Sequence, residues 1–557
     1  MTPKQLAAAE RFDRHMLAAT GNTYDEYERV RDSGPMSLAH VQLYGKLVDE
    51  SGAAEALDAW FSSERKSNAG RKAHLSFRAV LILHLMHAAD GNIRYQNIAR
   101  TLSARMTPET RGYLGITLHD GNRNDWYQRY WRSLNRLLTL VSPWKVPRNT
   151  FLSGPAYQRA LETYSQERRD RMDEVMNRLA HASARRLPAD IRATYRGNLA
   201  IDATPIKISG RPNPNVGNLA SARTNLDAMS GRYSRRDDHV GKGTNDDESA
   251  WELETVVTVP NNPGDPGSFP VLTTGLTMHH PGNSTHGALI AVKFHTSLFN
   301  KRGYIMADRL YSYMQPHYFQ LPTRKMGYHH VFDMRVDQLG KTGAIGDIIC
   351  VEGALYLRWM PKDLVNARKD FVAGTIDRDT YEARMTSRSR YRLKAKGGPD
   401  ADGSQRFLYP DARALMLFDP ATGKQLKTNP EPPGTFTLHP DSPESLRILK
   451  ILQAFEYKSD KWRRWYGLRS HVEANNQFLK DDAHADLSNR NKRRPRGYAY
   501  QALASASAAA ISNLRRVVNF LKSTRDRADP PKHRARRRTD EFGNRLPRRD
   551  GSEVQQV

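Results

Sequence analysis

The segment from Tyr466 to Lys480, YGLRSHVEANNQFLK, carries four polar side chains at helical spacing. At about 100° per residue, an arc of about 60° on one helix face holds Tyr466, Arg469, Glu473 and Lys480. The apolar side chains point to another sector, which predicts an amphipathic helix. A phenol, a guanidinium, a carboxylate and an ammonium on one face suit an anionic phosphate chain and a metal ion. The alternative is an exposed helix in which Arg469 and Glu473 form an ordinary ion pair.

Two aspartates upstream offer further oxygen ligands. Asp202 lies inside the apolar run GNLAIDATPIKI, and Asp308 follows the apolar run GYIMA. Both runs predict short strands. Phosphodiester chemistry with two Mg²⁺ ions needs several carboxylates, because one ion activates the attacking oxygen and the other stabilises the leaving oxygen. A single strand-end aspartate is more often a turn or cap residue, so the prediction of a metal site depends on the two aspartates together with Glu473.

The elements that must position these acids form an α/β domain in two parts. Strand and helix patterns predict a mixed sheet over residues 197–335, which resumes with helices over residues 446–522. Residues 210–248 are rich in Gly, Asn, Pro, Arg and Asp and predict a flexible insertion. Residues 336–445 predict a β-rich insertion subdomain. The basic tail, residues 523–557, is expected to be disordered.

Residues 1–196 predict an all-helical N-terminal region. Within it, helices over 77–86 and 93–102 flank the turn sequence Asp-Gly-Asn. Such a pair is compatible with a helix-turn-helix that reads DNA, and an ordinary packed bundle is an equal alternative. The side chains that would contact DNA in the first interpretation are Arg94, Gln96, Asn97 and Arg100.

The composition favours a polyanionic partner. Lys and Arg number 86 against 60 Asp and Glu, a net charge of +26, so nucleic acid is the leading candidate. The single cysteine, Cys350, excludes an intrachain disulfide and a thiolate zinc cluster and fits a reducing cytoplasm. No apolar run is long enough to span a bilayer, so no membrane association is expected.

The spacing Tyr-x₂-Arg-x₃-Glu-x₆-Lys, with IDATPI around Asp202 and ADRLYS around Asp308, resembles the DDE transposases of bacterial insertion sequences. In that family the third acid lies in a Tyr-Arg-Glu-Lys signature helix. The resemblance covers about residues 197–521 and includes the β-rich insertion before the glutamate helix. Leu310 is one departure, because relatives often carry glycine there.

The resemblance implies a ribonuclease-H-like catalytic core in which Asp202, Asp308 and Glu473 bind two Mg²⁺ ions, for which Mn²⁺ can substitute. It also implies that Tyr466, Arg469 and Lys480 grip the DNA backbone. Further DNA contacts are expected from a tryptophan that stacks on a flipped base and from the basic run NRNKRRPR; the candidates are Trp462, Trp465, Arg493, Arg494 and Arg496.

The function implied is a DNA transposase that binds terminal repeats, cleaves DNA ends and catalyses strand transfer. Its partner would be double-stranded DNA, both transposon ends and target, and it would act as a homodimer on paired ends in the bacterial cytoplasm at the nucleoid. Two alternatives stay open. One is a metal-dependent nuclease of the same fold without strand transfer, and the other is a catalytically inactive DNA-binding relative.

Overall fold

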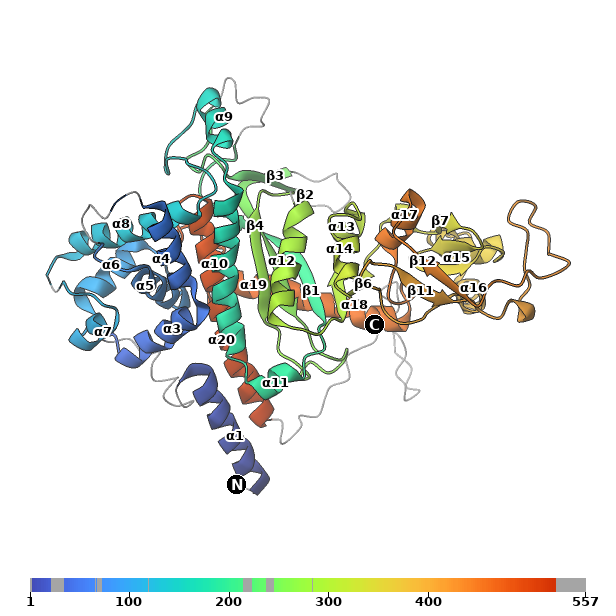
Figure 1. Cartoon of the computed structure of the whole chain (residues 1–557), viewed down its shortest axis with the longest axis horizontal. Coiled ribbons are helices and arrows are strands. Elements are labelled where there is room, and N and C mark those ends of the chain that lie inside the picture. The colour runs from blue at the N-terminus through green and yellow to red at the C-terminus, as the bar shows by residue number, and fades with distance from the viewer. Residues whose placement is uncertain are drawn as a thin grey trace, which may run out of the picture.

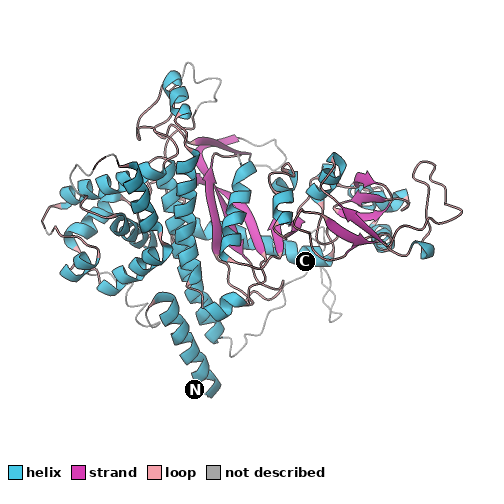
Figure 2. Cartoon of the chain, viewed as in Figure 1, coloured by secondary structure: helices cyan, strands magenta, loops and turns pink. Residues whose placement is uncertain are grey.

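The computed structural model describes residues 3–21, 35–65, 67, 73–118, 120–213, 223–236, 245–282 and 284–526. The chain is a mixed α/β protein, and its described residues form one six-stranded sheet and two three-stranded sheets (Figures 1 and 2). In the view of Figure 1 the N-terminal helices and α20 lie to the left of the large sheet, and the two small sheets lie to its right. Within the described residues, no helix has the length and apolar character needed to cross a bilayer.

Helices precede the large sheet along the chain. They are α1 (Pro3–Thr20), α3 (Leu38–Ser51), α4 (Ala53–Glu64), α5 (Phe77–Ala89), α6 (Tyr95–Ala104), α7 (Pro108–Tyr113), α8 (Arg123–Val141), α9 (Gly154–Glu162), α10 (Gln166–Arg185) and α11 (Ala189–Ala193). Hydroxyl side chains cap several of them: Ser76 accepts from the backbone N–H of Ala79 at the start of α5. The α5 helix is buried along nearly its whole length, so it forms the centre of this helical group.

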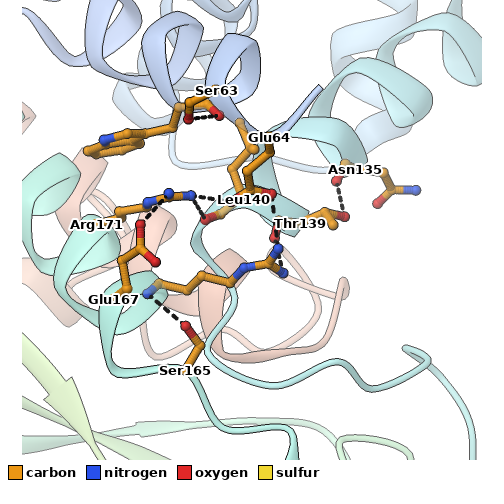
Figure 3. A network of polar contacts seen from close by, with 10 residues as sticks. Ser63, Glu64, Asn135, Thr139, Leu140, Ser165, Glu167 and Arg171 are labelled. Atoms are coloured by element: carbon orange, nitrogen blue, oxygen red, sulfur yellow. Dashed lines mark hydrogen bonds and ion pairs between the residues drawn. The ribbon is translucent and has the colours of Figure 1, made fainter. Parts of the chain in front are cut away.

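A polar network ties three of these helices together (Figure 3). Arg168 and Arg171 of α10 both bind the carboxylate of Glu64 at the end of α4. Arg168 also donates to the carbonyl of Thr139 in α8 at 3.0 Å, and Arg171 donates to Glu167 at 2.5 Å. Because one carboxylate accepts from two guanidinium groups, the ends of α4 and α10 are held in a fixed relation.

The last helix returns to this N-terminal group. The α20 helix (Tyr498–Asp526) lies beside α10 (Figure 1) and also packs against α5 and α1. Its buried face is rich in small residues, which allow close helix packing, among them Ala502, Ala506, Ala509 and Ala510. The expected disordered tail was placed too early, because residues 523–526 continue α20 and Leu521 still packs in the core. Residues 527–557 lie outside the described residues.

The large sheet combines antiparallel and parallel pairs. Its strands are β1 (Leu199–Lys207), β2 (Gly231–Arg236), β3 (Asn245–Thr258), β4 (Thr273–His279), β5 (Tyr304–Ala307) and β6 (His329–Phe332). The order is β2-β3-β1-β5-β6, with β4 also paired to β3. The β3 strand is antiparallel to β1, β2 and β4, whereas β1, β5 and β6 run parallel to one another. The carboxyl ends of β1 and β5 therefore lie at the same edge of the sheet.

The prediction of a flexible insertion over residues 210–248 is wrong for much of its described part. The β2 strand and the start of β3 form an antiparallel ladder there. These strands could not be recognised by hydrophobic alternation because their composition is polar. Ion pairs take the place of apolar contacts: Arg232 binds Asp247, and Glu248 binds Lys207 and Arg490. Residues 214–222 and 237–244 lie outside the described residues.

The two faces of the sheet are covered by different helices. These are α12 (Ser284–Leu298) on one face and, on the other, α18 (Asp460–Tyr466), the 3₁₀ turn η4 (Gly467–Arg469) and α19 (Ser470–Lys480). Alternate residues of β1 separate accordingly: Leu199 and Ile201 pack with Val292 of α12. Ala200 belongs to the cluster that holds Val472 of α19. This period of two sets the direction of every side chain along β1 and β5.

Short helices and an insertion follow β5. The elements are α13 (Arg309–Tyr313), α14 (Gln320–Lys325), η2 (Val336–Gln338), β7 (Lys341–Ile345), β8 (Ile348–Val351), β9 (Ala354–Leu357), α15 (Lys362–Val372), α16 (Arg378–Ser389), β10 (Lys394–Ala395), β11 (Gln405–Leu408), η3 (Ala412–Ala414), β12 (Thr435–Leu438) and α17 (Pro443–Ile451). The strands form two antiparallel sheets, β7-β8-β9 and β10-β11-β12.

A buried ionic network holds this insertion to the chain that leaves it. Glu352, in the turn between β8 and β9, accepts from Arg368 of α15 at 3.1 Å and from Arg388 of α16 at 2.8 Å. Arg388 also binds Glu456 at 3.2 Å. The side chains of Glu352 and Arg388 are fully buried. Such a network is costly to break on one side only, so it fixes the relative positions of α15, α16 and the returning chain.

Candidate active site

Strand periodicity places both predicted aspartates on the face of the sheet that α19 covers. Asp202 shares the direction of Ala200 on β1, and Asp308 follows β5 in phase with Met306, which packs in the same cluster as Val472. Asp308 also begins α13, where its Oδ1 accepts from the N–H of Leu310 at 2.8 Å. Leu310 thus adopts the turn without glycine, because the aspartate side chain caps it.

The predicted continuous helix from Tyr466 to Lys480 is interrupted. Tyr466 ends α18, Gly467–Arg469 forms the 3₁₀ turn, and Glu473 and Lys480 lie on α19. Gly467 has no side chain to favour the α-helix, and the backbone tightens at this point. Helical dihedral angles continue through the turn, so Arg469, Glu473 and Lys480 still project toward the sheet.

Arg469 brings the three predicted acids together. Its Nη2 lies 3.6 Å from Asp202 Oδ1 and 3.7 Å from Asp308 Oδ2, and its Nη1 donates to Glu473 Oε1 at 2.6 Å. The three acids come from a strand, a strand end and a helix that are far apart in the sequence. The Arg469 side chain is 17% exposed and Asp202 20%, while Glu473 is 52% exposed. One guanidinium therefore lies among three carboxylates in a partly buried site that is open on the side of Glu473.

Other α19 side chains hold β1 in place. Asn476 donates to Asp202 Oδ2 at 3.4 Å and accepts from Thr255 of β3 at 2.8 Å. Lys480 donates to the hydroxyl of Thr204 at 2.6 Å. Sequence reasoning did not identify Asn476. Its place one helical turn after Glu473 is the signal that would have found it.

The two candidate tryptophans differ in accessibility. Trp462 is 1% exposed, and its ring stacks on Tyr466 at 4.4 Å between centroids. The Trp462 ring, which was predicted to stack on a base, is part of the core beneath α19. Trp465 is half-buried and packs against Tyr304 at 4.4 Å. Tyr466 is also half-buried, and burial raises the pKa of its hydroxyl, so it acts as a neutral phenol.

The electrostatics of the site reflect an excess of carboxylates. Burial raises the pKa of Asp202 to about 7; Arg469 opposes this shift, and Asp308 and Glu473 add to it. Burial also raises the pKa of Asp308, against the opposing effects of Arg469 and the N–H of Leu310. A single guanidinium thus does not offset the negative charge that gathers here, and the site favours further positive charge.

A fourth acid near the site, Glu254, was not identified from the sequence. Glu254 on β3 is fully buried on the opposite face from Asp202. It accepts from Tyr311 and contacts His279 Nε2 at 3.1 Å. Although burial lowers the pKa of His279, the contact with Glu254 raises it above its usual value. The sequence gives no signal of this burial, because Glu252 and Glu254 alternate with Trp251 and Leu253 as on a strand with one exposed face.

The carboxylate oxygens of the three acids are ligands of the kind that hard divalent cations prefer. Carboxylates from three elements are the ligands that Mg²⁺ prefers, and burial raises the pKa values of Asp202 and Asp308. In the described residues no group of three acids or histidines is arranged to hold a metal as it stands, and Arg469 lies between Asp202 and Glu473.

An open basic groove of about 730 Å³ lies between α6, α8 and the segment 494–496. Aromatic rings also line it, among them Trp131, which is 42% exposed. None of the described residues that line it is acidic. Its cations come from three separate segments: Arg94, Arg148, Arg494 and Arg496. The groove thus joins the two predicted DNA-contact regions, since Arg94 also donates to the carbonyl of Asn491 at 2.6 Å.

The residues predicted to contact DNA differ in how exposed they are. Arg494 is exposed in the groove, and Gln96 and Arg100 are exposed on α6. Asn97 is half-buried. Arg496 is half-buried and donates to Asn149 at 2.8 Å. Arg493 is 3% exposed and donates to the carbonyls of Leu487 and Lys207, so it holds these two segments together.

Comparison with known proteins finds no matching family model, no matching curated protein and no matching solved structure.

Proposed function

We propose that the chain is a DNA transposase of the DDE type, which cleaves DNA ends and joins them to target DNA. The observation that carries the proposal is the contact of Arg469 with Asp202, Asp308 and Glu473. Three acids predicted from separate sequence contexts gather around one side chain of the signature segment. Such convergence is not expected of an exposed helix with an ordinary ion pair.

The sheet supports a ribonuclease-H-like core. The β4-β3-β1-β5-β6 part has three antiparallel strands followed by two strands parallel to β1. Asp202 lies within β1, Asp308 directly follows the neighbouring parallel strand β5, and Glu473 lies on α19, which packs over β1 and β3. The β2 strand pairs with the N-terminal half of β3, so it extends the sheet without changing the order of the strands around β1.

The chain's own groups have distinct tasks in this proposal. Asp202, Asp308 and Glu473 would hold divalent cations, which when bound activate a water or hydroxyl and stabilise the leaving oxygen. Arg469 is close enough to the acids to bind the phosphate under attack, for which its planar fork is suited. Asn476 orients Asp202. Lys480 holds β1 through Thr204 and adds positive charge beside the site.

Duplex DNA is proposed as the partner of the basic groove. Four arginines without an acidic neighbour in the lining provide phosphate contacts. The exposed edge of α6 adds polar side chains for base contacts, as in the helix-turn-helix interpretation. Paired ends would require two copies of the chain.

Cleavage of DNA that carries the inverted repeats flanking the gene tests the proposal. Asp202→Ala, Asp308→Ala and Glu473→Ala should each abolish Mg²⁺-dependent cleavage and leave binding in a gel shift largely intact. Asp481→Ala, at an exposed acid just after α19, is the matched control and should cleave normally. Retained cleavage by Glu473→Ala would refute the assignment.

Two further assays separate the alternatives. Strand transfer with pre-cut ends distinguishes a transposase from a nuclease of the same fold, which would give cleavage alone. A catalytically inactive relative would bind DNA in a salt-sensitive manner and give no Mg²⁺-dependent product.

A further inference from the structure

A second polar cavity lies at the opposite end of β5 from Asp308. Its volume is about 530 Å³, and it lies between the sheet, the insertion and the chain that returns at residues 452–461. Tyr304 and His329, at the starts of β5 and β6, form one wall, and Lys394 and Phe407 of the small sheet form another. The cavity is therefore separate from the acid cluster.

Two buried donors in its lining lack partners among the described residues. Arg324 of α14 is 2% exposed; it donates to Gln405, and its Nε has no hydrogen-bond partner. Gln453 is 7% exposed, and its Oε1 accepts from the N–H of Phe332 at 2.9 Å. This contact fixes the amide orientation and leaves Nε2 as a donor without a partner. Buried polar groups are nearly always satisfied, so two such donors beside one cavity indicate an acceptor ligand.

A histidine adds a third unpartnered nitrogen. His330 is fully buried, its Nε2 contacts the hydroxyl of Thr323 at 2.8 Å, and its Nδ1 has no partner in the described part of the chain. Nδ1 donates or accepts according to the tautomer. An oxyanion that carries both bare oxygens and a hydroxyl, such as a phosphate, satisfies either form.

The charge of the cavity favours an anion over a neutral ligand. Three further cations line it: Arg392, Lys394 and Lys461. Glu456 is the only acid of the lining, and it is engaged by Arg388 and by the hydroxyl of Tyr356. Burial lowers the pKa of Arg324 to about 10, with no carboxylate to oppose the effect. An anion would supply the charge that this buried guanidinium lacks.

We propose that this cavity binds the phosphate group of a nucleotide, with Arg324 and Gln453 as its buried donors and Lys394 and Lys461 at its rim. Aromatic side chains also line the cavity: Tyr304, Phe407 and Phe455. The phosphate comes from a free mononucleotide or from the 5′-phosphate of a DNA end, and both present the same group. This site does not depend on the cleavage chemistry proposed above.

Isothermal titration calorimetry of the full chain in phosphate-free buffer with chelator tests the site, using inorganic phosphate as the first probe. Gln453→Glu keeps the acceptor for Phe332 but replaces the free donor with a carboxylate, which should weaken phosphate binding at least tenfold. Gln338→Glu, the same change at a nearly buried glutamine outside the cavity, should bind as the parent does. Circular dichroism melting of both variants checks that each is folded.

Rim variants keep the test independent of the buried positions. Lys394→Ala and Lys461→Ala, at exposed lysines, should each weaken phosphate binding several-fold, while Lys427→Ala, exposed on the insertion away from the cavity, should not. A mononucleotide, the matching nucleoside and a 5′-phosphorylated oligonucleotide then identify the source, since the nucleoside lacks the phosphate and should not bind. Absence of binding for every phosphorylated probe, or equal binding by parent and Gln453→Glu, overturns the proposal.

Discussion

The guanidinium of Arg469 donates to Glu473 at 2.6 Å while its other nitrogen faces Asp202 at 3.6 Å. The same cation therefore occupies the space between acids that a divalent ion would also bind. Arg469→Ala removes this competing charge, and Mg²⁺ should then raise the melting temperature of the variant more than that of the parent. Arg463→Ala, which removes an exposed ion pair with Asp460, is the control and should respond to Mg²⁺ as the parent does. An unchanged Mg²⁺ response in Arg469→Ala would show that the arginine and the ion do not compete.

Asp202→Asn should stabilise the protein in the absence of divalent ions. At pH 8 the carboxylate is ionised although burial and its acidic neighbours raise its pKa to about 7. The neutral amide of asparagine has the same shape as the carboxylate but carries no charge. It therefore avoids both the burial of a charge and the repulsion by the neighbouring acids, and this is expected to add about 1–3 kcal/mol to the free energy of unfolding. Urea unfolding at pH 8 in chelator measures it, and Mg²⁺ should stabilise the parent alone. A lower stability of Asp202→Asn would contradict the role of charge repulsion.

His295 should make the protein less stable in acid. Burial lowers its pKa to about 3, while the unfolded chain retains the usual value near 6.5. The folded state thus holds His295 neutral, and its contribution is fully present above pH 6.5 and declines as pH falls toward 3. His295→Gln should reduce the slope of unfolding free energy against pH by up to about 1.4 kcal/mol per unit below pH 6. Chemical denaturation at pH 4.5 to 7.5 checks it. Identical slopes would show that His295 is protonated in the folded state.

Glu352→Gln should destabilise the insertion strongly. The substitution leaves Arg368 and Arg388 buried with less negative charge nearby, and the loss of one partner of a buried pair typically costs about 3–5 kcal/mol. Limited proteolysis should then cut first within residues 336–445. Glu382→Gln is the control, because it removes only an exposed pair with Arg378 and should cost less than about 1 kcal/mol.

Arg494→Ala should weaken DNA binding through the basic groove. Removal of one phosphate contact is expected to reduce the slope of log affinity against log salt by about 0.9. Arg413→Ala, on an arginine that is 81% exposed on the insertion, should leave the slope unchanged. Fluorescence anisotropy with duplex DNA at several salt concentrations gives both values. Equal slopes for the two variants would exclude the groove as a phosphate-binding surface.

The periodic parts of the fold could be predicted from the sequence, because local patterns specify them. The period of two places Asp202 in phase with Ala200 on β1, and the spacing of the signature segment implies that Arg469 and Glu473 are neighbours. That Asp308 faces the same way depends on the pairing of β5 with β1, which the sequence does not specify. Tertiary contacts decide the rest. Trp462 and Arg493 look like ligands of DNA in sequence, but each is enclosed by segments that join it only after folding.

Strands of polar composition could not be predicted from hydrophobic alternation either. The β2 strand contains Gly231–Arg236, with little apolar content, and Arg232 pairs with Asp247 of the neighbouring β3 strand. Glu254 was missed for the opposite reason, because a buried glutamate satisfied by Tyr311 and His279 cannot be recognised before its partners are known.

Because α20 packs against α5 and α10, the N-terminal helices cannot bury their whole apolar surface until the ribosome has synthesised α20. The helices α1 to α11 are made before the large sheet, yet the helix that covers their apolar surface, α20, is made only after the sheet and the insertion. At cellular elongation rates this surface waits on the order of tens of seconds for α20. A truncation before Tyr498 therefore leaves an uncovered N-terminal core that is prone to aggregate.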